Sequence, residues 1–317
     1  MNFGKIEYLF AKFRNIFWVI LRRIIGYSKF TRKSYNGKKI ESYDFTNREI
    51  LKALLNEKTP FLASRFGDTE LRTVIYTIEI CIGLRKKYPR SICEKMRMNA
   101  GFFPATQENM FLFGKLMIES CKEVDIFGVW YNLLEDFVID KFNPRSKLVV
   151  LESLEPYRNK NPWSAALKGK KVLVIHPFAE TINNQYQRRE KIFDNKNVLP
   201  DFELITLKAV QSNANSKVNY EDWFIALEDM YQKAKNIDFD IAIVGCGSYG
   251  MPLSAKLKQL NKKVIHLAGA TQLLFGIRGA RWDERPEMKH LFNDNWVRPA
   301  ESETPELASK VEGGCYW

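Results

Sequence analysis

The sequence predicts an α/β protein: a single Rossmann-like domain with a mostly parallel sheet, preceded by an N-terminal amphipathic helix. From residue 45 onward, short apolar runs alternate with longer amphipathic stretches, the pattern of repeated strand–helix units. Two of the runs, 172–175 and 241–244, are apolar at every position. Strands that are apolar on both faces are typical of a parallel sheet covered by helices on each side.

Seven strands and six helices are predicted in this body. Each strand is a short run rich in Val, Ile, Leu or Phe, and these runs cover 61–65, 124–129, 148–151, 172–176, 203–207, 241–245 and 264–268. Each helix is a longer stretch with apolar positions three or four apart, and these stretches cover 46–56, 69–80, 107–122, 179–193, 220–234 and 252–260. Residues 41–317 are expected to form one domain whose ligands bind beyond the carboxyl ends of its strands.

Charge and cysteine usage exclude several classes of protein. The net charge is +12, but residues 1–40 hold ten Lys or Arg and a single acidic residue, so the body is close to neutral. The basic character therefore belongs to residues 1–40, which argues against nucleic-acid binding by the rest of the chain. Five scattered cysteines, none in a Cys-x-x-Cys pair, fit a reducing cytosol and give no zinc framework.

Residues 1–40 are expected to form a basic amphipathic arm and linker. Apolar residues recur three or four positions apart in one stripe: Phe3, Ile6, Phe10, Phe13, Phe17, Ile20 and Ile24. The longest apolar run, 16–21, is far shorter than the roughly 20 residues of a spanning helix. No small-residue cleavage site follows, so a secretory signal peptide is not expected.

A helix of this kind is typical of one that lies on an anionic membrane, and residues 1–33 are expected to bind such a surface. In two alternatives the stripe packs on the body of the protein, or pairs with a second copy as a short coiled coil. Residues 29–39 are expected to be a polar linker. On this view, deleting 1–33 should abolish membrane association and leave activity on soluble acceptors intact.

The most informative motif follows the first strand of the body. In Arg-Phe-Gly-Asp-Thr-Glu, residues 65–70, Gly67 permits a tight turn and Asp68 and Glu70 emerge two positions apart. Carboxylates at a strand end can hold Mg²⁺ or Mn²⁺ together with substrate phosphates, which Arg65 could also grip. In the alternative interpretation, Asp68 caps a helix and both acids are stabilised by its positive end.

This motif resembles the signature of the GT-D-type glycosyltransferases, bacterial enzymes that build surface polysaccharides and glycoprotein glycans. The resemblance runs from about residue 45 to the C-terminus and includes 174–180 and the glycine loop 245–250. It implies that Asp68 and Glu70 bind a divalent metal and the diphosphate of a sugar nucleotide. Where the family usually has Gly between the acids, this chain has Thr69, which would be strained if the turn needed a positive φ there.

A glycine-rich loop follows a later strand. Residues 245–250 fit G-x-G-x-x-G and open a helix, so that Gly245, Gly247, Ser248 and Tyr249 could contact a phosphate or an acceptor. A dinucleotide site is disfavoured because the next strand ends in His266 rather than in a ribose-binding acid. The alternative is that these glycines serve only a tight turn.

Two other strand ends carry candidate groups. His176 and Glu180 are the most plausible acid/base pair, because glycosyl transfer to a hydroxyl benefits from removal of its proton. Arg278 and Arg281 could hold the leaving diphosphate, and Trp282 could stack on a base or sugar. The alternatives are a structural His176 and a solvated loop packed over Trp282. The aromatic end of the chain, 316–317, could dock over the site.

The sequence, with this resemblance, therefore favours a metal-dependent glycosyltransferase, with Mn²⁺ or Mg²⁺ as cofactor, that moves a hexose from a nucleotide sugar to a glycan. The nucleotide is expected to be UDP. The expected acceptor is lipid-linked, and the expected location is cytoplasmic and peripheral at the inner face of the cell membrane. Two other classes stay open: another Rossmann-type enzyme, such as a nucleotide-dependent oxidoreductase or methyltransferase, and a non-enzymatic membrane-associated scaffold.

Overall fold

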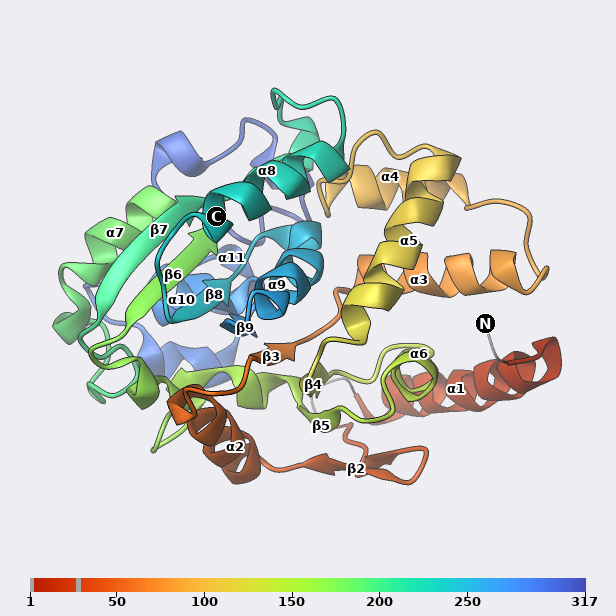
Figure 1. Ribbon diagram of the computed structural model, residues 1–317, viewed down its shortest axis with the longest axis horizontal. Helices are drawn as coiled ribbons and strands as arrows, with labels where there is room; N and C mark the ends of the chain where they lie inside the picture. The colour runs from red at the N-terminus through yellow and green to blue at the C-terminus, as the bar shows by residue number, and fades with distance from the viewer. Residues whose placement is uncertain (1–2, 27–29) are drawn as a thin grey trace.

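A single sheet of nine strands runs through the molecule (Figure 1). The structure, a computed structural model, describes residues 3–26 and 30–317. The strand order is β1-β2-β5-β4-β3-β9-β8-β6-β7, and every pair is parallel except β1 with β2. The strands are β1 (Ser34–Tyr35), β2 (Lys38–Glu41), β3 (Phe61–Ser64), β4 (Ile126–Val129), β5 (Lys147–Val150), β6 (Lys171–His176), β7 (Glu203–Lys208), β8 (Ile241–Val244) and β9 (Lys263–His266).

Both faces of the sheet are buried, because successive side chains of a strand point to opposite sides. In β6, Leu173 and Ile175 pack into one hydrophobic core while Val172 and Val174 pack into the other. The apolar runs that suggested a covered parallel sheet therefore fill two separate cores. The predicted α/β class with a mostly parallel sheet is confirmed.

Helices cover the two faces unequally. The first core is closed by α1 (Lys5–Ile25), α3 (Asp68–Cys81), α4 (Arg90–Met98), α5 (Gln107–Cys121), α6 (Glu135–Phe142), α8 (Trp223–Lys235) and α9 (Gly250–Gln259). The second is closed by α2 (Tyr43–Leu55), α7 (Ala179–Tyr186), α10 (Ala270–Leu274) and α11 (Ala280–Asp283). Figure 1 shows α1 at one edge of the molecule, beside α6 and below α3.

The predicted elements are all present, with differences at their ends. The helix expected over 179–193 ends at Tyr186, and the buried Ile192 and Phe193 that extended the pattern follow a separate turn. Helices α4, α6, α10 and α11 were not predicted. The linker expected over 29–39 is wrong for its described part, because β1 and β2 form a hairpin and β2 pairs with β5. Lys29 lies outside the described residues.

The N-terminal amphipathic helix is confirmed as α1, a helix of 21 residues. Among the described residues, no helix has both the length and the apolar character that crossing a membrane requires.

Candidate active site

A cavity of about 490 Å³ lies at the carboxyl ends of the central strands. Residues that follow β3, β4, β6, β8 and β9 line it, as expected for the ligand site of an open parallel sheet. Its wall includes Arg65, Asp68, Glu70, His176 and the backbone around Gly247. The predicted residues that line the cavity come from five segments that are distant in the sequence: 65–70, 176, 245–249, 281 and 316–317.

Asp68 and Glu70 lie in the first turn of α3, with Gly67 as the residue before the helix. The Asp68 carboxylate accepts a hydrogen bond from Arg72 Nε at 2.8 Å. The Glu70 carboxylate folds back over Gly67, at the third helical position where a glutamate caps the helix start. Thr69 is helical and needs no positive φ, so the expected strain at this position is absent.

Burial raises the pKa of the Glu70 carboxyl, and the neighbouring charge of Asp68 raises it further. A divalent cation beside the two carboxylates would stabilise their charged forms. Within residues 3–26 and 30–317, no group of three or more His, Cys, Asp or Glu side chains could hold a metal. A metal role for Asp68 and Glu70 therefore stays a prediction, and an ion held by these two acids would need its other ligands from substrate phosphates and water.

Arg65 faces these acids from the end of β3. Its guanidinium lies over the indole ring of Trp130, 4.7 Å from the ring centroid. Burial lowers the pKa of Arg65, and the Glu70 charge opposes that shift. Because a guanidinium stays protonated at neutral pH, Arg65 presents a fixed positive charge with its planar face held by an aromatic ring.

Arg281 brings a second guanidinium to the cavity wall. It lies over the Tyr316 ring at 4.7 Å and forms an ion pair with Glu312. Arg22 and Arg285 also line the cavity. Among the described residues, the cavity wall therefore holds four arginines and three carboxylates, those of Asp68, Glu70 and Glu312. Arginines beside carboxylates suit a diphosphate bound together with a cation.

His176 ends β6 with its ring buried. Its Nδ1 accepts a hydrogen bond from the backbone N–H of Phe178 at 3.0 Å. Burial lowers the pKa of His176 to about 3, so the ring is neutral at pH 7. With Nδ1 acting as an acceptor, the single proton is on Nε2. His176 can thus donate a hydrogen bond to a substrate oxygen, whereas removing a proton would require the other tautomer.

Glu180 does not pair with His176. It is exposed at the start of α7, where its carboxylate accepts a hydrogen bond from Ser302 Oγ at 2.9 Å, and it does not line the cavity. The first-turn N–H groups of Glu180 and Thr181 donate to Glu303 instead. The predicted acid/base pair is therefore not formed, because the helix turns residue 180 away from the strand end.

Arg278 and Trp282 are also placed outside the cavity wall. Arg278 is bound to Asp283 through Nε and Nη2 at 3.1 and 3.0 Å. Trp282 is 4% exposed and packs beneath Tyr316. Of the three residues expected from this loop, only Arg281 lines the site, and the packed-loop interpretation holds for the other two.

The glycine loop forms the floor of the cavity through its backbone. Gly247 has a φ of +58°, and a Cβ on Gly245 would lie 2.5 Å from Thr271 Oγ1. The Ser248 hydroxyl donates to the carbonyl of Ala100 at 2.6 Å and accepts from Trp223 Nε1 at 2.9 Å. The Tyr249 ring stacks on Trp223. Ser248 and Tyr249 thus hold the loop in place, and the tight-turn interpretation accounts for their side chains.

His266 is a cavity residue to which the sequence analysis gave no role. It ends β9, its Nδ1 is 2.8 Å from Ser64 Oγ, and its Nε2 is buried without a partner. Burial, aided by the charge of Arg65, lowers the pKa of His266 to about 3. Gly250 is required here, since a Cβ would lie 2.1 Å from Nε2. Only its strand-end position could have indicated this residue.

The C-terminal tail closes the cavity. Tyr316 and Trp317 line it, and Gln272 Nε2 donates to the Tyr316 carbonyl at 3.1 Å. Arg298 donates to the carbonyl of Trp317 at 3.1 Å. The expectation that the aromatic end docks over the site is confirmed.

No protein-family model matches the chain, and no curated protein matches it. Two solved structures are similar to it. One is described as "The highly conserved domain of unknown function 1792 has a distinct glycosyltransferase fold" (13% identity, TM-score 0.42, covering 73% of this chain and 78% of that one). The other is a selenomethionine-substituted structure of the same domain of unknown function (13% identity, TM-score 0.43, 74% and 79%).

Proposed function

We propose that this protein is a metal-dependent glycosyltransferase that moves a hexose from a UDP-linked nucleotide sugar to a glycan acceptor. The observation that carries the proposal is one cavity whose wall holds Arg65 and Arg281 together with the carboxylates of Asp68 and Glu70. A nucleoside diphosphate with a bound divalent cation has the complementary charges. The acceptor is proposed to be lipid-linked and presented at the cytoplasmic face of the membrane.

Each group of the cavity wall has its own role in this proposal. Arg65 and Arg281 bind the diphosphate and stabilise the negative charge that builds on it as the sugar leaves. Asp68 and Glu70 would hold Mn²⁺ or Mg²⁺, which would supply further stabilisation of that charge. His176 donates a hydrogen bond from Nε2 to a substrate oxygen. Tyr316 and Trp317 exclude water from the reacting atoms, which limits hydrolysis of the donor.

The test is calorimetric titration of UDP-glucose, UDP-galactose and UDP-N-acetylglucosamine into the full-length protein, with and without Mn²⁺. Asp68→Asn removes one charge at the candidate metal position. Asp44→Asn is the matched control, because Asp44 is also a first-turn acid, on α2, and does not line the cavity.

Binding of one sugar nucleotide that needs Mn²⁺, is lost in Asp68→Asn and survives in Asp44→Asn would support the proposal. Binding that is independent of Mn²⁺ and equal in all three proteins would refute the metal role. Failure of the wild type to bind any sugar nucleotide, with tight binding of NAD or S-adenosylmethionine, would indicate a different Rossmann-type enzyme.

A further inference from the structure

Helix α1 is docked with its polar side inward and its apolar side outward. Tyr8 and Asn15 are 0% and 1% exposed. The apolar stripe, by contrast, is largely uncovered, with exposed fractions of 72% at Ile6, 73% at Phe10, 78% at Phe13, 58% at Phe17, 51% at Ile20 and 77% at Ile24. A surface helix of a soluble domain ordinarily has the opposite arrangement. The alternative in which the stripe packs on the body is therefore wrong for all of it except Phe3, which contacts Phe137.

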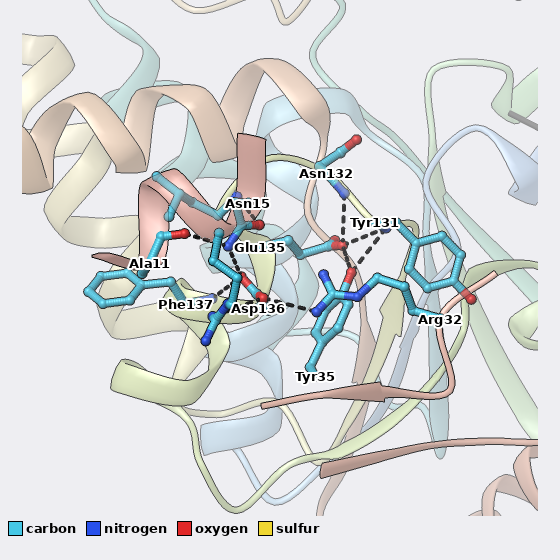
Figure 2. A network of polar contacts seen from close by, with 11 residues as sticks. Ala11, Asn15, Arg32, Tyr35, Tyr131, Asn132, Glu135, Asp136 and Phe137 are labelled. Carbon is cyan, nitrogen blue, oxygen red and sulfur yellow. Dashed lines mark hydrogen bonds and ion pairs between the residues drawn. The ribbon is translucent and has the colours of Figure 1, made fainter. Parts of the chain in front are cut away.

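Buried carboxylates fix the polar side of α1 to the body. Asn15 Nδ2 donates to Asp136 Oδ1 at 2.8 Å, and Asn15 Oδ1 accepts from the N–H of Leu134 at 3.0 Å (Figure 2). Nearer the start of α1, the Tyr8 hydroxyl and Lys12 Nζ both donate to Glu79 Oε1, at 2.8 and 2.7 Å. Undocking the helix would remove these partners from buried charges, so α1 is held rigidly.

We infer that the exposed stripe of α1 is a docking surface for an anionic membrane, fixed in orientation relative to the cavity. Exposed basic side chains flank the stripe at Lys5 and Arg23, whereas Arg14 is paired with Asp136. Phenylalanine and isoleucine enter the acyl boundary while these cations pair with anionic head groups. A second copy packed stripe to stripe would instead bring the same cations together.

The docked helix is also part of the cavity's support. Arg22 of α1 lines the cavity and donates to the carbonyl of Tyr131 at 3.3 Å. Next to Asp136, Glu135 Oε2 accepts a hydrogen bond from the N–H of Tyr131 at 2.9 Å (Figure 2). It also accepts one from the N–H of Trp130 at 3.1 Å. A membrane bound to the stripe therefore lies at a set position from the cavity wall that carries Trp130. This inference rests on the proposed function only for the identity of the acceptor.

The experiment is co-sedimentation of the full-length protein with vesicles of phosphatidylcholine alone or mixed with phosphatidylglycerol. The test variant is Phe10→Ser/Phe13→Ser/Phe17→Ser. The matched control, Leu55→Ser/Leu112→Ser/Ile225→Ser, removes three exposed apolar side chains from α2, α5 and α8. All three test positions are exposed, so both variants should melt like the wild type.

We expect the wild type and the control to pellet with the phosphatidylglycerol vesicles. The test variant should bind them more weakly by about tenfold per phenylalanine removed. Equal pelleting of the test and control variants would overturn the inference. So would a wild-type dimer that ignores vesicles and dissociates in the test variant, since the stripe would then bind a second copy.

Hydrogen exchange separates a fixed helix from a loose tether. On vesicles, the amides of residues 130–136 should stay as protected as in solution; faster exchange there would show that α1 leaves the body when it binds lipid. Neither readout needs metal or nucleotide. Loss of vesicle binding with intact sugar-nucleotide binding would overturn this inference alone, and the converse result would overturn the proposed function alone.

Discussion

The carboxylate of Glu70 lies so close to the Cα of Gly67 that a Cβ on residue 67 would be 1.9 Å from Oε2. The position of the Glu70 carboxylate therefore depends on the glycine at residue 67, because that carboxylate occupies the space that a side chain at residue 67 would take.

Gly67→Ala should displace the Glu70 carboxylate while leaving the fold intact. The obstructing atoms belong to the end of a flexible side chain, and the backbone of residue 67 is extended with φ −75°, so the strain can be relieved by a rotamer change. We expect metal-dependent donor binding to weaken at least about tenfold, with a stability loss under about 1 kcal/mol. Gly4→Ala is the control, because nothing lies within 4 Å of its new Cβ. Unchanged donor binding in Gly67→Ala would show that the position of Glu70 is not needed.

Arg65→Lys should weaken binding of the donor by roughly 10- to 100-fold, measured by calorimetry. A lysine keeps the charge but loses both the stacking on Trp130 and the planar pair of donors. Arg189→Lys serves as control, since Arg189 stacks on Tyr186 away from the cavity. Equal affinities in the two variants would mean that Arg65 does not touch the diphosphate.

His176→Asn should flatten part of the acid dependence of stability. Burial lowers the pKa of His176 to about 3, so between about pH 6.5 and 3 the unfolded chain binds a proton that the folded chain does not. This contribution to stability is present above pH 6.5 and lost as the pH falls. Urea unfolding at pH 7.5 and 5 should show the wild type losing about 2 kcal/mol more than the variant. Substituting the exposed His290 should leave the difference unchanged.

Glu135→Gln should remove a loss of stability that the wild type shows as the pH rises, the opposite pH dependence to that of His176. Burial raises the pKa of Glu135 to about 7, so the folded chain keeps a proton that the unfolded chain has released above about pH 4.5. Stability is therefore lost as the pH rises toward 8. An amide preserves the acceptor used by Tyr35 and places its N–H₂ at Oε1, which has no partner. Between pH 5 and 8 the wild type should lose about 2 kcal/mol relative to the variant. If the wild type and Glu135→Gln lost the same stability between pH 5 and 8, the raised pKa of the Glu135 carboxyl would be refuted. Glu108→Gln is the control, because Glu108 is exposed.

Deleting residues 1–33 should destabilise the whole protein, contrary to the expectation for a removable arm. The deletion takes Asn15 and Arg32 from Asp136, whose side chain is fully buried. Asn15→Ala alone should cost about 2 kcal/mol in urea unfolding, because it leaves part of a buried carboxylate unpaired. Gln232→Ala, which removes an exposed amide bonded to Glu228, should cost much less. A fully stable deletion variant would show that α1 contributes nothing to the fold.

The sheet could be predicted because its central strands are apolar on both faces, a pattern that few other structures require. Strand β2 could not, since Lys38–Glu41 is four residues with three charges and is a strand only because β5 lies beside it. Helix α6 begins with Glu135 and Asp136, which read as solvent-exposed acids until their partners on α1 and β1 are known.

The candidate site shows the same division. Arg65, Asp68 and Glu70 are local to one strand end, so their proximity could be predicted from their spacing. The pairing of His176 with Glu180 was wrong because the first turn of α7 directs residue 180 to Ser302. His266 is held in the site by its contact with Ser64, which is 202 positions away in the chain, so its proximity could not be predicted from spacing.

The contact between β3 and β9 has a consequence for synthesis. Ser64 and His266 meet across this seam, and the wall of the cavity needs both strands. A nascent chain therefore has no complete cavity until most of its length has left the ribosome, and closing so long a loop favours slow folding. Truncated chains should therefore be unable to bind the proposed donor, so that only full-length molecules would compete for it in the cell.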